Sequence, residues 1–337
     1  MQAHLLRESL RLKSVLRIEV LRSAQEMCRL RPAWARLAAA DTTIFQDPGW
    51  NLLAAQIFAG RESPHVIWAH SSWGQAIIPA VLRRDDAGQS LRLLGEELFD
   101  YRTFLHAGDD AVLRCALSQL SRMACPLQIT ALRQSDVNSV SADLGLEPFT
   151  VAPGIGCKEV SAETFSQKHL RLARNLRRMQ RLGFELKTYD GSQSQLLQTI
   201  YQNKAEQEQE SLFRDPLRRQ FMVRAAMLDP HRVGIFTLEN GSRLGAALVT
   251  LLDPGVRRFY TCWFSAEISK HSPALSLIYE VTKHSLADGL DCDYMTGEQP
   301  YKLRLATSAV PLFRLYATAE QLASLGSPSA QELKLAS

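Results

Sequence analysis

The segment Val233–Lys302 decides the fold of this chain. It opens with VGIFTLENGSRLGAALVTLLDPGVRRFYTCWFS (233–265), in which three short apolar runs occupy 233–239, 244–252 and 257–265. Asn240-Gly241 separates the first two runs, and Asp253-Pro254-Gly255 separates the last two. These are turn sequences, because glycine adopts the positive φ that tight turns need. The segment therefore predicts an antiparallel meander of three strands.

A helix and a fourth strand should follow the meander. HSPALSLIYEVTKHSLADGL (271–290) has Ser272 at the N-cap, Pro273 at the first helical position and Gly289 just past the end. Side chains at three- and four-residue steps predict a core-facing stripe: Leu275, Ile278, Tyr279, Thr282 and Leu286. The run 291–295 should re-enter the sheet parallel to the third strand. The helix N-terminus then offers unpaired N–H groups and partial positive charge, which suit a pyrophosphate.

Length and composition indicate a soluble globular protein of one large or two ordinary domains. The chain has 337 residues, of which 46% are apolar and 22% charged. The longest apolar segments are too short to span a bilayer, and the Arg-rich N-terminus lacks the apolar core of a secretory signal. We therefore expect a cytoplasmic protein. Its six cysteines include no CxxC pair, so we expect reduced thiols and no metal site.

The positive charge of the chain lies in its second half. Residues 1–150 carry 16 basic and 16 acidic side chains, whereas residues 151–337 carry 23 and 19. The stretch 168–181 holds six cations and no acid: Lys168, Arg171, Arg174, Arg177, Arg178 and Arg181. Four of these arginines fall on one helical face. That face could meet an anionic substrate, a membrane surface or tRNA, or it could be the solvated side of a packed helix.

The order of elements repeats along the chain. The first half predicts strands at 16–22, 65–69, 76–82, 91–94 and 127–132, with helices at 24–40, 48–59 and 110–123. The second half repeats this order with a strand at 184–189 and helices at 194–210 and 216–227 before the meander. Corresponding elements lie about 165 residues apart without detectable identity. We expect an α/β (α+β) protein of two like halves, each a mixed, mostly antiparallel sheet flanked by helices.

Domain boundaries follow from this repeat. We expect an N-terminal domain at 1–150, a C-terminal domain at 151–325 that ends in a strand near 312–316 and a short helix, and a frayed tail at 326–337. The two halves differ at the helix that faces the ligand. In the first half it begins at Asp109-Asp110, two carboxylates that would repel a phosphate, and in the second it begins after Lys270-His271-Ser272. The second half is therefore the expected donor-binding half.

The sequence resembles the GNAT acyltransferases, and within them the CelD/BcsL-like branch related to the FemAB transferases. The resemblance is carried by AWARLAAADTTIFQDPGW (33–50), HLRLARNLRRMQRLGFEL (169–186), HSPALSLIYEVTKHSLADGL (271–290) and DYMTGEQPYKLRL (293–305). It implies two GNAT-like halves, the first degenerate, and acyl-CoA as the co-substrate. The usual glycine-rich phosphate loop is absent, since the equivalent stretch is Ser269–Ala274. A donor other than coenzyme A, such as the aminoacyl-tRNA of FemAB proteins, therefore stays open.

Acyl transfer to an amine requires a base, an acid and a polarised carbonyl. GNAT enzymes often place a thiolate-protonating tyrosine where Tyr301 falls, and Asp293 and Glu298 flank the same strand end as candidate bases. For the donor we expect contacts from Phe264, Ser265, Lys270, His271, Ser272, Ala274 and Leu275. For the acceptor or its anionic groups we expect contacts from Lys302, Glu206, Arg174 and Arg178. Each also has an ordinary structural interpretation as a core, capping or solvated side chain.

These features together predict an acyl-CoA-dependent N-acyltransferase that works by direct attack of an amine. The resemblance implies an acceptor such as an amino sugar or another envelope- or exopolysaccharide-related amine. Two alternatives remain. One is a FemAB-like transferase that uses aminoacyl-tRNA, although a basic helix without interleaved aromatics argues against nucleic acid. The other is a non-catalytic GNAT-fold component of a polysaccharide-synthesis assembly.

Overall fold

The computed structural model describes residues 16–38, 43–86, 88–133 and 144–326. The chain divides into two compact units, of which unit 1 comprises residues 1–149 and 312–337 and unit 2 comprises residues 150–311. The chain passes from one unit to the other within two strands, β9 (Gly145–Ile155) and β15 (Ser308–Ala317). No helix of the described ranges is both long and apolar enough to cross a bilayer.

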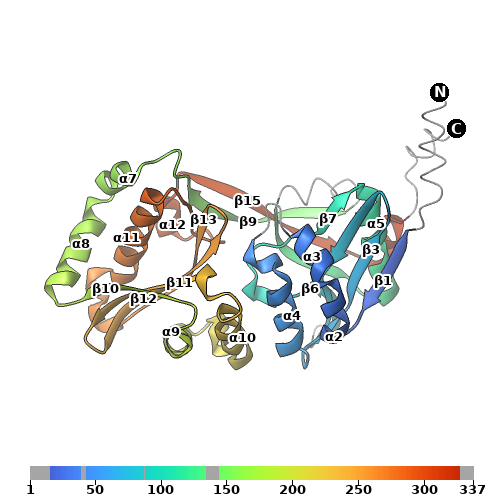
Figure 1. The fold of residues 1–337 in the computed structure, drawn as a ribbon, viewed down its shortest axis with the longest axis horizontal. Coiled ribbons are helices and arrows are strands. Elements are labelled where there is room, and N and C mark those ends of the chain that lie inside the picture. Colours follow the sequence, from blue (N-terminus) through green and yellow to red (C-terminus); the bar gives the residue numbers. More distant parts are fainter. Residues whose placement is uncertain (1–15, 39–42, 87, 134–143, 327–337) are drawn as a thin grey trace. The chain divides into compact units, whose positions relative to one another are not determined.

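The sheet of unit 2 contains the predicted meander (Figure 1), with strands in the order β10-β11-β12-β13-β14-β9. Its bounds are β10 Glu185–Asp190, β11 Val233–Asn240, β12 Arg243–Asp253, β13 Val256–Phe264 and β14 Asp291–Asp293. Successive strands from β10 to β13 pair antiparallel, and β13 pairs parallel with β14 as predicted. Gly241 and Gly255 lie in the two turns at φ 58° and 73°, which explains the turn chemistry of the sequence.

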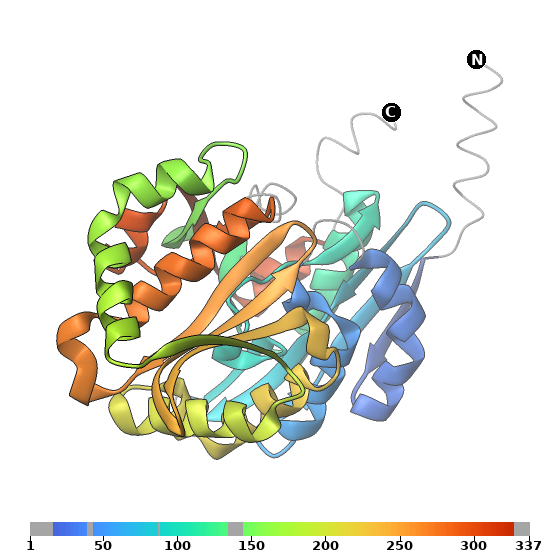
Figure 2. The same ribbon diagram turned by 60° about the vertical axis from the view of Figure 1, so that its left-hand side comes forward.

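Helices cover both faces of this sheet. They are α7 Ala162–Lys168, α8 Leu170–Arg181, α9 Ser194–Gln207, α10 Pro216–Ala226, α11 Pro273–Ala287 and α12 Pro300–Leu305. Figures 1 and 2 show α8 and α11 on one face and α9 and α10 on the other. The core on the α11 side joins Leu277 and Ile278 to Leu176 and Met179 of α8 and to Leu248 of β12. The predicted helix after Ser272 is therefore confirmed, and its apolar stripe meets both the sheet and α8.

Unit 1 has two sheets, in the orders β1-β3-β4-β7 and β15-β8-β6-β5-β2. The strands are β1 Arg17–Leu21, β2 Glu62–Pro64, β3 Val66–His70, β4 Gly74–Ile78, β5 Ala80–Asp85, β6 Gly88–Leu93, β7 Leu105–Gly108 and β8 Leu127–Arg133. The helices are α2 Ala24–Met27, α3 Arg31–Leu37, α4 Pro48–Ile57, α5 Asp110–Gln119 and α13 Ala319–Ser324. Most pairs are antiparallel, and β6 pairs parallel with β8. The expected class, mixed and mostly antiparallel sheets flanked by helices, is confirmed.

Two expectations for unit 1 need correction. The single strand expected at 76–82 is two strands, because Pro79 has no N–H for a ladder and separates β4 of one sheet from β5 of the other. The single helix expected at 24–40 is broken by a 3-10 turn at Cys28–Leu30, and Pro32 lies just inside the next helix. Strand β7 was not foreseen, because its sequence LHAG carries little β signal.

The C-terminal end of the chain belongs to unit 1, which differs from the boundary expected at 325. Leu315 and Ala317 on β15, with Leu322 on α13, are buried in one cluster with Leu117 and Leu127 of unit 1. Burying these apolar side chains explains why the chain returns to unit 1 after Pro311. Of the expected frayed tail, residues 327–337 lie outside the described ranges.

Candidate functional site

A cavity of about 500 Å³ lies at the N-terminus of α11, within unit 2. It is lined by Lys168, His169, Arg171, Leu172, Asn175, Ser272, Leu275, Tyr301, Arg304 and Leu305. Three of these residues, Ser272, Leu275 and Tyr301, were expected at the site from the sequence. The lining comes from α7, α8, α11 and α12, so four helices that are separate in the sequence converge on the start of α11.

The first turn of α11 presents unpaired donors toward this region. Ser272 adopts a left-handed conformation (φ 50°), and its hydroxyl makes no capping hydrogen bond. Its N–H donates to Ser269 O (2.9 Å), and its carbonyl accepts from Ser276 N (3.0 Å). Pro273 has no N–H, and no acceptor in the described ranges pairs with the N–H of Ala274 or Leu275. The helix end therefore keeps two donors and its partial positive charge for a ligand.

Cationic side chains surround the same cavity. Lys168 lies at the end of α7, Arg171 on the first turn of α8 and Arg304 on α12, and no acidic side chain belongs to the lining. Lys168 and Arg171 are exposed, and Arg304 Nε donates to Pro300 O (3.3 Å). Leu172, Leu275 and Leu305 supply apolar walls between these charges. Such a cavity suits a ligand with an anionic group and an apolar arm.

The neighbouring strands β13 and β14 separate toward this end of the sheet. They pair only from Val256 to Arg258 on β13, whereas β13 continues to Phe264. A β-bulge interrupts the pairing of β12 with β13, since Val249 pairs with Thr261 and Thr250 with Phe259, which leaves Tyr260 as the extra residue. A bulge bends its strand and re-aims the side chains that follow. Because the pairing with β14 ends at Arg258, the edge of β13 beyond the bulge has no partner in β14.

Tyr301 and Cys262 are half-buried weak acids in this region, close enough for their charges to interact. Burial raises the pKa of Tyr301 far above its usual value, and the negative charges of Cys262 and Glu208 raise it further. Burial likewise raises the pKa of the Cys262 thiol, which Glu208 also raises while Lys204 and Lys302 lower it. The phenol of Tyr301 therefore stays protonated at neutral pH and can donate a proton.

The carboxylate of Glu208, the residue that follows α9, acts on the same region. Gln207 Nε2 donates to Phe264 O (2.9 Å), which ties the end of α9 to the end of β13. Glu208 follows directly and pairs with Lys204 (2.5 Å), and its charge acts on both Tyr301 and Cys262. Glu206, the α9 residue expected to contact the acceptor, is exposed and accepts from Gln202 (2.7 Å).

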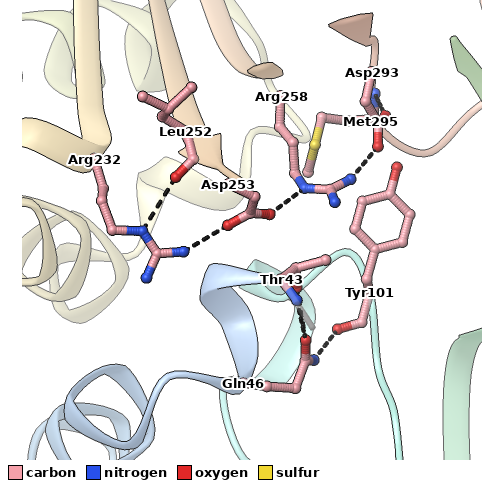
Figure 3. Close-up of polar contacts among 9 residues, drawn as sticks. All are labelled: Thr43, Gln46, Tyr101, Arg232, Leu252, Asp253, Arg258, Asp293 and Met295. Atoms are coloured by element: carbon pink, nitrogen blue, oxygen red, sulfur yellow. Dashed lines mark hydrogen bonds and ion pairs between the residues drawn. The ribbon is translucent and has the colours of Figure 1, made fainter. Parts of the chain in front are cut away.

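Asp293 and Lys302 have buried structural partners. Arg258 donates to Asp293 Oδ2, and Asp293 Oδ1 accepts from Met295 N (2.7 Å; Figure 3). Lys302 is 8% exposed and donates to Thr296 O (2.6 Å) and Met295 O (3.5 Å). Both residues therefore hold the turn at Met295, whose φ is 63°. Lys302 was expected to attract an anion, but its ammonium points at backbone carbonyls. Glu298, the other expected base, is exposed beyond this turn.

The remaining expected donor contacts lie just before the α11 N-terminus or in its first turn. Lys270 is exposed and His271 half-buried on the 3-10 helix Ala266–His271, which leads into Ser272. Phe264 and Ser265 were expected to polarise a carbonyl through backbone N–H groups. The N–H of Ser265 instead donates to Gly245 O (2.8 Å), so it is already paired and cannot do so. Ala274 is buried, and its contribution is confined to the backbone.

The basic helix lines the cavity with Arg171, Leu172 and Asn175, all in its first two turns. Arg171 lines the cavity, whereas Arg174 and Arg178, the expected substrate contacts, lie outside it and are exposed. Sequence analysis did not select His169, Arg304 or Leu305 for the site. Pro300 followed by Tyr301, Arg304 and Leu305 at helical spacing was the available signal for the last two.

His169 is the least expected of these residues. Burial lowers its pKa, with Lys168 adding to the effect. Its ring lies 4.7 Å from that of Phe165, and among the described residues Nε2 is buried without a hydrogen-bond partner. A neutral imidazole therefore lies next to the two cations that begin the basic helix.

The corresponding helix of unit 1 is closed to anions. Asp109 caps α5, and its carboxylate accepts from Ala111 N (2.9 Å). Asp110 pairs with His106 (3.1 Å) in the same turn. Negative charge therefore occupies the α5 N-terminus, which matches the contrast between the halves that the sequence indicates.

Comparison with known proteins identifies the class of the second unit. Residues 166–303 match the acetyltransferase (GNAT) domain family. No curated protein sequence gives a significant match. This stretch of the second unit, from the end of α7 to α12, is thus similar to a GNAT acetyltransferase domain.

Several solved structures share the fold over most of the chain. The C-terminal domain of a putative lysylphosphatidylglycerol synthetase from Agrobacterium fabrum aligns with a TM-score of 0.58 at 11% identity, covering 90% of this chain and 94% of that one. FemX aligns with a TM-score of 0.57 at 10% identity, covering 92% and 99%. A tandem GNAT protein from the clavulanic acid biosynthesis pathway aligns with a TM-score of 0.51 at 11% identity, covering 94% and 100%. The chain therefore has a tandem GNAT fold.

Proposed function

We propose that this protein transfers an acyl group from acyl-CoA to an amine by direct attack, and that it belongs to the CelD/BcsL-like branch of GNAT proteins. The observation that carries the proposal is the cavity at the α11 N-terminus. The N–H groups of Ala274 and Leu275, together with Lys168, Arg171 and Arg304, provide donors for a pyrophosphate. The apolar walls between them suit the uncharged arm of the same donor.

Proton transfers are assigned to two side chains. Tyr301 lines the donor cavity and holds its proton at neutral pH, so it protonates the leaving thiolate. Glu208 is the carboxylate whose charge reaches Tyr301, so it accepts the proton of the attacking ammonium. The amine attacks the thioester carbonyl, the carbon–sulfur bond breaks, and no covalent enzyme intermediate is needed. Lys270 and His271 lie on the approach to Ser272 and add positive charge for the donor phosphates.

The acceptor follows from the family resemblance. We propose an amine on an amino sugar or on another envelope- or exopolysaccharide-related molecule. Glu206, exposed on α9 near Glu208, is proposed to contact this amine-bearing molecule. Arg174 and Arg178 continue the cationic face of α8 away from the donor cavity and are proposed contacts for anionic groups of a substrate.

The test is a calorimetric titration with acyl-CoAs of graded chain length. Binding should weaken about tenfold or more in Arg171→Gln and in Arg304→Gln, because each removes a charge-assisted contact worth roughly 1.5–3 kcal/mol. Arg177→Gln, an exposed residue of the same helix outside the cavity, should bind like the parent. Equal affinities in all three variants, or no binding by the parent, would contradict the acyl-CoA proposal.

Aminoacyl-tRNA is the second candidate donor, because α8 presents five arginines and no acid, and FemX shares the fold. This candidate predicts tight tRNA binding that weakens steeply with salt and negligible binding of coenzyme A. A third outcome, no turnover with either donor although the protein is folded, would favour a non-catalytic GNAT-fold component.

A further inference from the structure

Unit 1 contains a second cavity, which no part of the proposed reaction uses. It measures about 380 Å³ and is lined by Arg92, Leu93, Glu97, Arg102, Gln128, Ile129, Thr130, Arg314, Leu315 and Tyr316. These residues come mainly from β6, β8 and β15. Figure 1 labels β6 and β15. Three guanidinium groups thus line one cavity, against the single carboxylate of Glu97 among its described lining residues.

Arg102 is the buried member of this set. It is 7% exposed, and its Nη1 donates to Leu93 O (3.3 Å) and Leu94 O (3.1 Å). Burial lowers the pKa of Arg102 to about 10, against the opposing effect of nearby carboxylates led by Glu62, so the group stays charged at neutral pH. A buried cation on a cavity wall favours an anion beside it.

Arg92 and Arg314 extend the positive wall. Arg92 Nη2 contacts Gln128 Oε1 (3.5 Å) and lies 3.9 Å from Asp85. The guanidinium of Arg314 lies 4.9 Å from the centre of the Phe149 ring and is otherwise exposed. Arg92 Nε also donates to Ser90 Oγ (3.4 Å). None of these contacts is the bidentate pairing that an arginine can make with an oxyanion.

We propose that this cavity binds the phosphomonoester group of a small molecule. Three arginine forks match the tetrahedral, dianionic oxygens of a phosphate better than a single carboxylate does. Leu93, Ile129 and Leu315, with the Tyr316 ring, provide a wall for the remainder of the ligand. The volume lies within the range of small-molecule sites. The proposal concerns unit 1 alone and does not rest on acyl transfer by unit 2.

The experiment measures the binding of inorganic phosphate and glucose 6-phosphate by calorimetry at constant ionic strength. The protein used carries Arg171→Gln and Arg304→Gln, so that the cavity of unit 2 does not contribute. Adding Arg314→Gln or Arg92→Gln should weaken glucose 6-phosphate binding about tenfold or more. Arg84→Gln, an exposed arginine on β5 of the same unit, serves as the matched control and should leave the affinity unchanged.

Two further variants sharpen the result. Glu97→Gln should strengthen binding, because it removes a negative charge from the cavity wall. Arg102→Lys keeps the buried charge but loses the fork, so a folded Arg102→Lys protein should bind less tightly. The proposal is overturned if the parent binds neither probe, or if Arg314→Gln and Arg92→Gln match Arg84→Gln. Glucose 6-phosphate should bind more tightly than phosphate, and equal affinities would rule out a site for a phosphorylated small molecule.

Discussion

Arg258 on β13 forms an ion pair with Asp293 on β14, although 35 residues separate them in the sequence. The two lie opposite each other at the last position where the parallel strands pair. On its other side Arg258 donates to Asp253 Oδ2 (2.5 Å), and Arg232 donates to Asp253 Oδ1 (2.6 Å; Figure 3). This chain of charges joins the β12–β13 turn to β14 immediately before the strands separate.

Asp253→Asn should destabilise unit 2. Asp253 is 4% exposed and is flanked by two arginines. Removing its charge leaves both guanidinium groups undercompensated, which costs about 3–5 kcal/mol for a buried pair. Urea unfolding measures the loss. Glu267→Gln breaks the exposed ion pair with Arg243 and should have a much smaller effect. Equal effects would show that burial does not matter to this network.

Tyr301→Phe should lower kcat while leaving donor affinity nearly unchanged. The variant keeps the half-buried ring but removes the phenolic proton proposed to reach the leaving thiolate. Loss of a general acid lowers the rate about 10²–10⁴-fold. Steady-state kinetics with the best acyl-CoA and amine provide the measurement. The control is Tyr279→Phe on α11, where the altered ring is buried and stacks on Phe165 of α7. Equal rates for both variants and the parent would exclude Tyr301 as the acid.

Glu208→Gln should lower kcat/KM most strongly below neutral pH, where more of the acceptor amine is protonated. Glu208 is proposed as the base because its charge acts on Tyr301 and Cys262. A loss of about 10²–10⁴-fold is expected for a general base. Glu210→Gln, at an exposed glutamate that the proposed reaction does not use, is the control and should keep the parent kcat/KM. An equal loss in both variants would contradict the assignment of Glu208 as the base.

His169 should make stability depend on pH below about 6.5. Burial lowers its pKa in the folded protein below the value of about 6.5 in the unfolded chain. As the pH falls through this interval, the unfolded chain takes up a proton before the folded one does, so stability decreases and then levels off below the folded-state pKa. In His169→Gln this part of the pH profile should be flatter. Urea unfolding at pH 7.5 and at lower pH tests it, and an unchanged profile would contradict the buried neutral imidazole.

Leu322→Ala should destabilise unit 1 rather than unit 2. Leu322 on α13 is fully buried in the core of unit 1, and truncating such a leucine costs about 2–5 kcal/mol. Hydrogen exchange should accelerate in residues 16–133 and stay unchanged in residues 150–311. Leu303→Ala alters a leucine that is 48% exposed and should change neither region. Faster exchange in unit 2 after Leu322→Ala would contradict the assignment of α13 to unit 1.

The meander and the helix that follows it were determined by local sequence. Asn240-Gly241 and Pro254-Gly255 form turns because of backbone chemistry that needs no distant partner. Pro273 begins α11 and Gly289 follows its end for the same reason. The asymmetry between the helix starts of the two halves was also readable, because charge at a helix end acts over one turn.

Tertiary structure alone decided which side chains share the donor cavity. The sequence marks four arginines on one face of α8, but the packing of Leu176 and Met179 against α11 selects Arg171 and leaves Arg174 and Arg178 outside. The pairing of Asp293 with Arg258 and the return of the chain to unit 1 after Pro311 likewise depend on contacts between distant segments. Helix and turn signals act over a few residues, whereas cavities, ion pairs and cores are set by how finished elements pack.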